Sequence, residues 1–309
     1  MMANMKIAIL GAGGVGSYFG GTLARTGHPV AFLARGAHLA ALREHGLTVR
    51  TPEGSFTVAM PGITASDDPA DLQGAELALV AVKSYSLPEI VPAARLLAAA
   101  GALVVPLLNG VEAADRLVAG GVPDERVLGG LTQISAVRLA PGVVERRSDF
   151  QRIIVGERRG GLSGRAESVA ALFREAGAEA RASADITADL WRKFIFITSM
   201  SAACGLARAP LGPVREAPLG TLLLERAVGE VTAVARALGV ALADETEAKV
   251  LANMETLPAA MKPSFLLDLE AGGPTEIADL SGAVSRLGRQ AGVATPVHDV
   301  ATAALGVAR

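Results

Sequence analysis

The sequence predicts an α/β domain over residues 1–184 and an all-α domain over residues 185–309. Three observations lead to this division. Short apolar runs alternate with helix-like segments in the first half, which is typical of a parallel sheet with helices on both faces. A glycine-rich turn follows the first apolar run, and from about Asp185 onward the hydrophobic periodicity is nearly all helical. A chain of 309 residues is long enough for two such domains.

The first half contains a regular succession of strand and helix signals. Strands are expected near Lys6–Leu10, Val30–Ala34, Leu47–Arg50, Phe56–Ala59, Leu77–Val82 and Leu103–Leu108. Helices are expected over Gly14–Thr26, Ala37–His45, Leu87–Ala99 and Val111–Ala119. Between Arg126 and Glu157, the Pro141-Gly142 pair predicts a hairpin that forms an antiparallel extension of the sheet.

The second half is expected to be a set of packed helices. Asp185 can cap a first helix that carries Lys193 and the apolar run after it. Further helices are predicted from Leu219 to Leu238 and from Asp244. The last clear helix is predicted to begin near Thr275, with apolar residues at core-facing spacing at Ile277, Leu280, Val284 and Leu287.

The glycine-rich turn is the strongest functional signal. Lys6 to Gly16 read Lys-Ile-Ala-Ile-Leu-Gly-Ala-Gly-Gly-Val-Gly, an apolar strand that leads into G-x-G-x-x-G. Backbone amides at such a turn, where it opens a helix, bind a pyrophosphate. Gly11 permits the tight turn, Gly13 lets the phosphates approach and Gly16 lets the helix pack on the strand. The predicted cofactor loop therefore comprises Gly11, Ala12, Gly13, Gly14, Val15 and Gly16.

Arg35 indicates which dinucleotide binds. The second apolar run ends in Arg35, where a protein that prefers NAD usually places Asp or Glu. An arginine at this position can pair with the 2′-phosphate of NADPH, so the sequence favours NADPH.

Composition and charge exclude several other classes. The formal net charge is -2 without a block of like charge, so nothing indicates a nucleic-acid or a polybasic membrane surface. The longest uncharged stretch near the middle, Phe194–Ala207, is too short to span a bilayer. A single cysteine, Cys204, suits a reducing cytoplasm, and its apolar helix predicts a core thiol. No residue spacing indicates a metal site, and the scattered histidines are expected at the surface or at helix ends. A homodimer is compatible with the apolar helices of the second half.

Lys83 and Asn109 follow predicted buried strands directly. In an open parallel sheet, ligands bind outside the carboxyl ends of the strands, so both side chains are expected near the cofactor. Two other interpretations stay open, because Asn109-Gly110 is a common turn dipeptide and Lys83 can simply be solvated.

Lys193 is the candidate proton donor. The chain has 24 arginines but only 5 lysines, and the 14 residues after Lys193 carry no charge. Burial among aromatic neighbours lowers the pKa of a lysine toward the range that is useful for proton transfer. Its helical neighbours Ile197 and Ser201 offer no carboxylate, so a partner has to come from elsewhere in the fold. The alternative is a lysine whose ammonium reaches solvent from the edge of a core helix.

Glu276 and Ser264 are the remaining candidates. Glu276 lies in the first turn of its predicted helix and can face the interior as the partner of Lys193, although acids are also favoured there by the helix dipole. Ser264 can be an ordinary N-cap, or can present its hydroxyl and nearby amides to a substrate carboxylate.

Taken in order, these residues resemble the ketopantoate reductase (2-dehydropantoate 2-reductase) family over nearly the whole chain. The resemblance covers Gly11–Gly16, Arg35, the Val-Lys-Ser at Lys83, Leu108-Asn109-Gly110 with Glu112, Leu190-Trp191-Arg192-Lys193, Lys262-Pro263-Ser264 and Thr275-Glu276-Ile277. It implies a Rossmann-type NADP-binding domain and a helical domain like that of 6-phosphogluconate dehydrogenase. It also implies NADPH-dependent reduction of 2-dehydropantoate to (R)-pantoate, a step in pantothenate and coenzyme A biosynthesis.

The resemblance also implies residue roles. Arg35 would bind the 2′-phosphate, Lys83 the cofactor phosphate or ribose, and Asn109 would position nicotinamide and substrate. Lys193 would be the general acid, Glu276 its orienting partner and Ser264 a substrate contact.

The chain departs from the family pattern at two substrate positions. Well-studied members have asparagines four and eight residues after the lysine, where this chain has Ile197 and Ser201. A bulkier or more apolar 2-oxo acid is therefore an alternative substrate, and a non-catalytic dinucleotide sensor is a second alternative.

Overall fold

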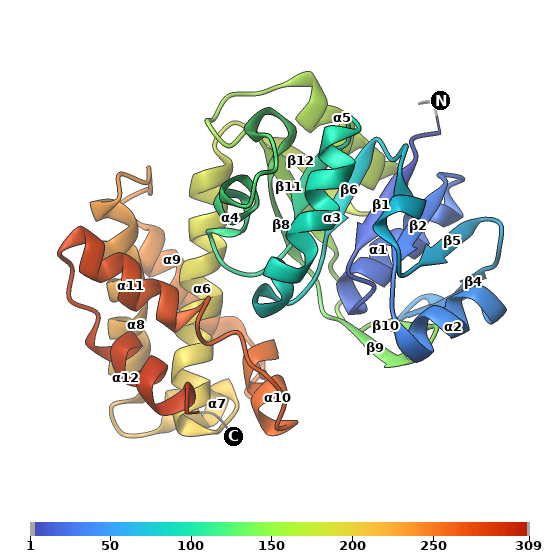
Figure 1. Cartoon of the computed structure of the whole chain (residues 1–309). Coiled ribbons are helices and arrows are strands. Elements are labelled where there is room, and N and C mark those ends of the chain that lie inside the picture. The colour runs from blue at the N-terminus through green and yellow to red at the C-terminus, as the bar shows by residue number, and fades with distance from the viewer. Residues whose placement is uncertain (1–3, 308–309) are drawn as a thin grey trace. The chain divides into compact units, whose positions relative to one another are not determined.

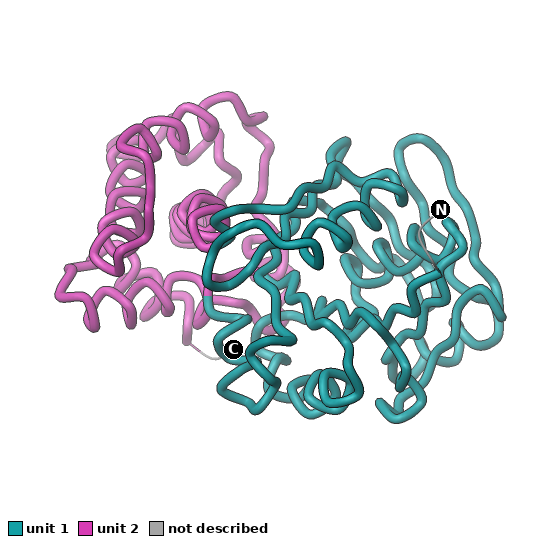
Figure 2. The backbone as a smooth tube through the Cα atoms, turned by 90° about the horizontal axis from the view of Figure 1, so that it is seen from above, with its two compact units in different colours: residues 1–108, 112–186 teal, residues 109–111, 187–309 magenta. Residues whose placement is uncertain are grey.

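The structure, a computed structural model, describes residues 4–307 and divides into two compact units (Figures 1 and 2). The α/β unit comprises residues 1–108 and 112–186, and the helical unit comprises residues 109–111 and 187–309. The predicted division after residue 184 lies two residues before this one. No pattern in the sequence indicated that residues 109–111 group with the helices.

A five-stranded parallel sheet forms the centre of the α/β unit. Its strand order is β5-β2-β1-β6-β7, and β1 pairs with β2 and β6 on its two sides. The strands are β1 (Ile7–Leu10), β2 (Val30–Leu33), β5 (Ile63–Ser66), β6 (Leu77–Val80) and β7 (Leu103–Pro106). The sequence predicted all of these except β5, a short edge strand with only two buried residues.

Helices cover both faces of this sheet, as the alternation of its side chains requires. In β1, Ile7 and Ile9 belong to the core that α1 (Gly14–Arg25) covers, whereas Ala8 and Leu10 belong to the core under α3 (Leu87–Ala99). The other helices of this unit are α2 (Gly36–His45), α4 (Ala113–Ala119) and α5 (Gly164–Glu175), with short 3-10 turns η1 (Pro69–Leu72), η2 (Ser84–Ser86) and η3 (Asp124–Arg126).

The predicted antiparallel extension of the sheet is wrong. A hairpin does turn at Pro141-Gly142, but its strands β9 (Ala136–Ala140) and β10 (Val143–Arg146) belong to a separate sheet of order β4-β3-β10-β9. There β10 pairs in parallel with β3, a partner far away in the sequence. The remaining strands of the two smaller sheets are β3 (Leu47–Thr51), β4 (Gly54–Val58), β8 (Gly129–Gln133), β11 (Arg152–Gly156) and β12 (Glu179–Ser183).

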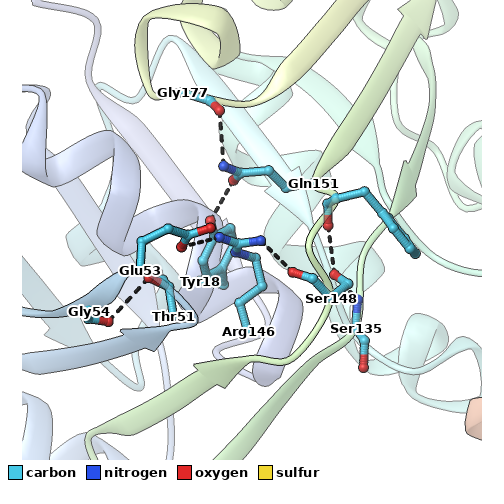
Figure 3. Close-up of polar contacts among 10 residues, drawn as sticks. Tyr18, Thr51, Glu53, Gly54, Ser135, Arg146, Ser148, Gln151 and Gly177 are labelled. Atoms are coloured by element: carbon cyan, nitrogen blue, oxygen red, sulfur yellow. Dashed lines mark hydrogen bonds and ion pairs between the residues drawn. The ribbon is translucent and has the colours of Figure 1, made fainter.

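A buried arginine joins this second sheet to α1. Arg146, at the end of β10, forms an ion pair with Glu53 in the turn between β3 and β4 and donates to the carbonyl of Ser148 (Figure 3). The guanidinium lies over the ring of Tyr18 from α1, whose hydroxyl donates to Gln151. Because a buried charge is costly unless paired, these contacts fix β10 against α1.

In the helical unit, α6 (Ile186–Ala207) contributes Trp191, Phe194 and Ile195 to the core. The other helices are α7 (Leu211–Glu216), α8 (Gly220–Ala237), α9 (Thr246–Thr256), α10 (Ser264–Glu270), α11 (Ser281–Ala291) and α12 (Pro296–Leu305). Within residues 4–307, no helix is both long and apolar enough to cross a membrane.

The predicted helix start near Thr275 is wrong, and the helix from there is not the last. Residues 277–280 form a turn, and α11 begins only at Ser281 because Leu280 has φ −103° and ψ −101°, which interrupts helical geometry. A further helix, α12, follows after Gly292, whose φ of +71° ends α11.

Candidate functional site

The glycine turn between β1 and α1 has the geometry that a dinucleotide pyrophosphate requires. Gly11 has φ +113°, and a side chain at Gly16 would collide with the Gly11 carbonyl oxygen. At Gly13, in contrast, nothing lies within 4 Å of where a Cβ would be, so the backbone is open to a ligand. The first turn of α1 has no side-chain cap and no acidic residue, which leaves its positive end suited to an anion. The residues present therefore fit a nicotinamide dinucleotide.

Gly14 is needed for a reason that the sequence did not reveal. A Cβ there would collide with the carbonyl oxygen of Ala136 at the start of β9. Ala136 on β9 is the register partner of Arg146 on β10. The strand that pairs with β9 at this position therefore also carries the arginine that forms the ion pair with Glu53. The second sheet thus packs against the glycine turn as well as against α1.

Arg35 and Lys83 both lie in the α/β unit, after strands that flank β1. Arg35 occupies the N-cap position of α2, and its exposed side chain forms an ion pair with Glu89, with 3.3 Å between Nη1 and Oε2. Lys83 is partly buried and precedes η2. Sequence reasoning missed Glu89, because an acid in the first turn of α3 is already explained by the helix dipole.

A chain of polar side chains lies in the helical unit. Lys193 Nζ on α6 donates to Asn109 Oδ1 at 3.0 Å, and Asn109 Nδ2 donates to Glu276 Oε2 at 3.2 Å. Glu276 is only 4% exposed. These three residues come from three separate segments, and we call them the Lys–Asn–Glu chain. It brings together the predicted proton donor, its predicted partner and the amide of Asn109.

Burial changes the acidity of Lys193, as the sequence predicted. Desolvation lowers the pKa of the Lys193 ammonium to about 8 from its ordinary 10.5, and the negative charge of Glu276 opposes part of this shift. The prediction of a desolvated lysine is confirmed. An amine with this pKa is mostly protonated at pH 7 and can still release its proton readily.

The other predicted substrate residues differ in their placement. Ile197 and Ser201 follow Lys193 at steps of four residues, so they share one face of α6, where Ser201 is 4% exposed. Of the two interpretations of Ser264, the N-cap is wrong, because Pro263 takes that position and Ser264 is the exposed first residue of α10. Glu276 is not in the first turn of a helix either, so the dipole does not explain its placement.

The histidines were expected at the surface or at helix ends, and only His45, the last residue of α2, is exposed. His38 and His298 do lie in the first turns of α2 and α12, but they and His28 are each at most 4% exposed. His298 Nε2 lies 3.0 Å from the Ala227 carbonyl oxygen, and His38 Nδ1 accepts from Gly142 N at 2.9 Å. Each ring satisfies polar backbone groups from distant segments, which no local pattern reveals.

The predicted core thiol is confirmed, since Cys204 is buried and its pKa is raised to about 11 by burial.

Comparison with known families covers nearly the whole chain. The family model described as "Ketopantoate reductase PanE/ApbA" matches residues 7–160, and the one described as "Ketopantoate reductase PanE/ApbA C terminal" matches residues 185–308. The 2-dehydropantoate 2-reductase of Halobacterium salinarum is 35% identical over 296 residues, which is 95% of each chain.

Solved structures of this family are similar to the chain over nearly its whole length. The crystal structure of a PanE/ApbA family ketopantoate reductase from Ralstonia eutropha JMP134 superposes with a TM-score of 0.88 at 31% identity, over 98% of each chain. A D-mandelate dehydrogenase, solved with NADH and anilino(oxo)acetate, has a TM-score of 0.86 at 26% identity, over 98% of this chain and 97% of its own.

Proposed function

Because the chain belongs to the ketopantoate reductase family, an oxidoreductase family that acts on a 2-oxo acid with a nicotinamide dinucleotide, we propose that it reduces 2-dehydropantoate to pantoate with NADPH. The observation that carries this proposal is the Lys–Asn–Glu chain, with its lysine pKa lowered to about 8.

The cofactor would be held by residues of the α/β unit. The amides at Gly13 and the first turn of α1 would bind the pyrophosphate, and Arg35 would bind the 2′-phosphate. Lys83 would contact the cofactor phosphate or ribose. The bound nicotinamide supplies the hydride for the carbonyl carbon C2 of the substrate.

Lys193 would supply the proton. Its Nζ would donate to the carbonyl oxygen of the substrate as negative charge develops there. Asn109 Oδ1 accepts one hydrogen of the ammonium and so orients it, while the charge of Glu276 favours the protonated form. Ser264, Ile197 and Ser201 are proposed to contact the substrate.

A second candidate is the reduction of another 2-oxo acid with a larger or more apolar side chain. Ile197 cannot hydrogen-bond the hydroxyl of ketopantoate, and the related D-mandelate dehydrogenase was solved with an aromatic oxo-acid ligand and NADH. The apolar side chain of Ile197 would suit the apolar side chain of such a substrate.

A substrate panel tests both candidates. The purified protein is incubated with NADPH or NADH and with 2-dehydropantoate, branched 2-oxo acids or aromatic 2-oxo acids, and loss of the reduced cofactor is followed by absorbance. The proposal predicts the highest kcat/KM for 2-dehydropantoate with NADPH. A higher value for an aromatic acid favours the second candidate, and tight cofactor binding without turnover of any acid would indicate a dinucleotide sensor.

A further inference from the structure

We propose that Glu89 sets the cofactor selectivity of this protein by competing with the 2′-phosphate of NADPH for Arg35. This inference rests on the proposed function, because it concerns how the same site distinguishes NADPH from NADH. It adds to Arg35 a second selectivity residue of opposite charge.

The topology of the central sheet places the ion pair at the cofactor turn. Arg35 follows β2, and Glu89 belongs to the segment that follows β6. In the strand order, β1 lies between β2 and β6 (Figure 1). The pair therefore spans the carboxyl end of β1, where the glycine turn begins and where a dinucleotide binds in sheets of this kind.

The Arg35 side chain can exchange Glu89 for another anionic partner. The side chains of Arg35 and Glu89 are 68% and 64% exposed, so neither is held by packing, and the 3.3 Å contact joins them through a single nitrogen. A guanidinium presents five donors and binds a phosphate through two of them at once. A 2′-phosphate can therefore displace the Glu89 carboxylate, whereas the neutral 2′-hydroxyl of NADH cannot.

Glu89 consequently weakens the binding of NADPH more than the binding of NADH. NADPH binding has to break the ion pair and then brings a dianion near the released carboxylate, and both effects oppose it. NADH leaves the pair in place. The position of Glu89 in the first turn of α3 also suits the helix dipole, but the dipole acts equally with either cofactor and alters no selectivity.

The test is the ratio of two dissociation constants. NADPH and NADH are titrated by fluorescence into the wild type, Glu89→Gln and a control, Glu167→Gln. The control removes a similar exposed ion pair, Glu167 with Arg174, from α5. We expect Glu89→Gln to tighten NADPH binding about two- to fivefold and to leave NADH binding within about twofold of the wild type. The control should match the wild type.

Salt and a second variant separate charge competition from a structural role. The advantage of Glu89→Gln should shrink between about 0.05 M and about 1 M salt, because ions screen exposed charges. It should also be smaller than in the wild-type background when Arg35 is replaced by Gln in both proteins, because Glu89 then has no Arg35 to compete for. If Glu89→Gln binds NADPH as tightly as the wild type or more weakly, this inference is overturned and the proposed function is not affected. If the wild type binds neither cofactor, both the inference and the proposed function are overturned.

Discussion

Lys193 and Asn109 lie 84 residues apart in the sequence, and Lys193 Nζ donates a hydrogen bond of 3.0 Å to Asn109 Oδ1. Asn109 in turn donates to Glu276, so one amide connects a partly buried amine to a buried carboxylate. All three residues belong to the helical unit. The acidity of the proposed proton donor is therefore determined within one compact unit, and it can be altered by single substitutions.

The pH dependence of turnover should report the ionisation of Lys193. Its pKa is about 8 in the free protein, and the protonated form is the donor, so kcat/KM for reduction should be level at neutral pH and fall above pH 8. With one ionisation the fall approaches about tenfold per pH unit. The measurement is kcat/KM for the 2-oxo acid from pH 6 to pH 10. A kcat/KM that stays level through this range would exclude Lys193 as the donor.

Replacing Glu276 by Gln should move this pH profile. The variant keeps an oxygen that can accept from Asn109 Nδ2 but removes the negative charge that raises the pKa of Lys193. The decline of kcat/KM should therefore begin at a lower pH than in the wild type, and kcat/KM at pH 7 should fall. Glu247→Gln on α9, which removes a surface partner of Arg236, serves as the control and should leave the profile unchanged. A profile of Glu276→Gln that overlays the wild type would show that this carboxylate does not act on Lys193.

Replacing Ile197 by Asn should change the choice of substrate. The position lies one turn after Lys193 on α6, and an asparagine there can donate to a substrate hydroxyl, which isoleucine cannot. One added hydrogen bond should raise kcat/KM for 2-dehydropantoate about fivefold and lower it for aromatic 2-oxo acids. The two specificity constants are measured side by side in the wild type and the variant. An equal change for both acids would mean that residue 197 does not contact the substrate side chain.

His298 should make the protein sensitive to acid. Its ring is fully buried between the Ala227 carbonyl and Ser281, and burial lowers its pKa to about 4 from the 6.5 of the unfolded chain. Between these values the unfolded state binds the proton and the folded state does not, so stability is complete above pH 6.5 and falls as the pH drops toward 4. The loss amounts to about 3 kcal/mol at 1.36 kcal/mol per pKa unit.

Urea unfolding of the wild type and His298→Asn between pH 4 and pH 7 measures this contribution. The variant should be less stable at pH 7 but should depend less on pH. His38, whose pKa is also lowered to about 4, is present in both proteins and cancels in the comparison. The exposed His45, changed to Asn, should leave the wild-type slope intact. Parallel slopes for the wild type and His298→Asn would contradict the assignment.

The sequence predicted those parts of the fold that local patterns determine. Buried parallel strands such as Leu77–Val80 are continuously apolar, and helix-ending glycines such as Gly239 have the positive φ that they require. The edge strand Ile63–Ser66 was missed because half of it is polar. The pairing of β10 with β3 was missed because it joins segments about a hundred residues apart, and hairpin signals carry no information on such partners.

In the candidate site, too, the features that depend on local sequence were predictable and those that depend on distant segments were not. The desolvation of Lys193 follows from the uncharged run after it, and that prediction is confirmed. The bridging position of Asn109 depends on three segments meeting in space, so spacing could not indicate it. The turn at Glu276 was mistaken for a helix because Ile277, Leu280 and Val284 have helical spacing, whereas the backbone at Leu280 departs from helical geometry.

The central claim is that Lys193 donates the proton in the reduction of a 2-oxo acid, and single-turnover kinetics of Lys193→Ala test it most directly. The variant is mixed with NADPH and saturating substrate, beside the wild type and Lys249→Ala, which removes an exposed lysine of α9. Lys193→Ala should lose between about 10²-fold and 10⁴-fold in rate while it binds NADPH as tightly as the wild type, and Lys249→Ala should lose nothing. A near-normal rate in Lys193→Ala would contradict the account.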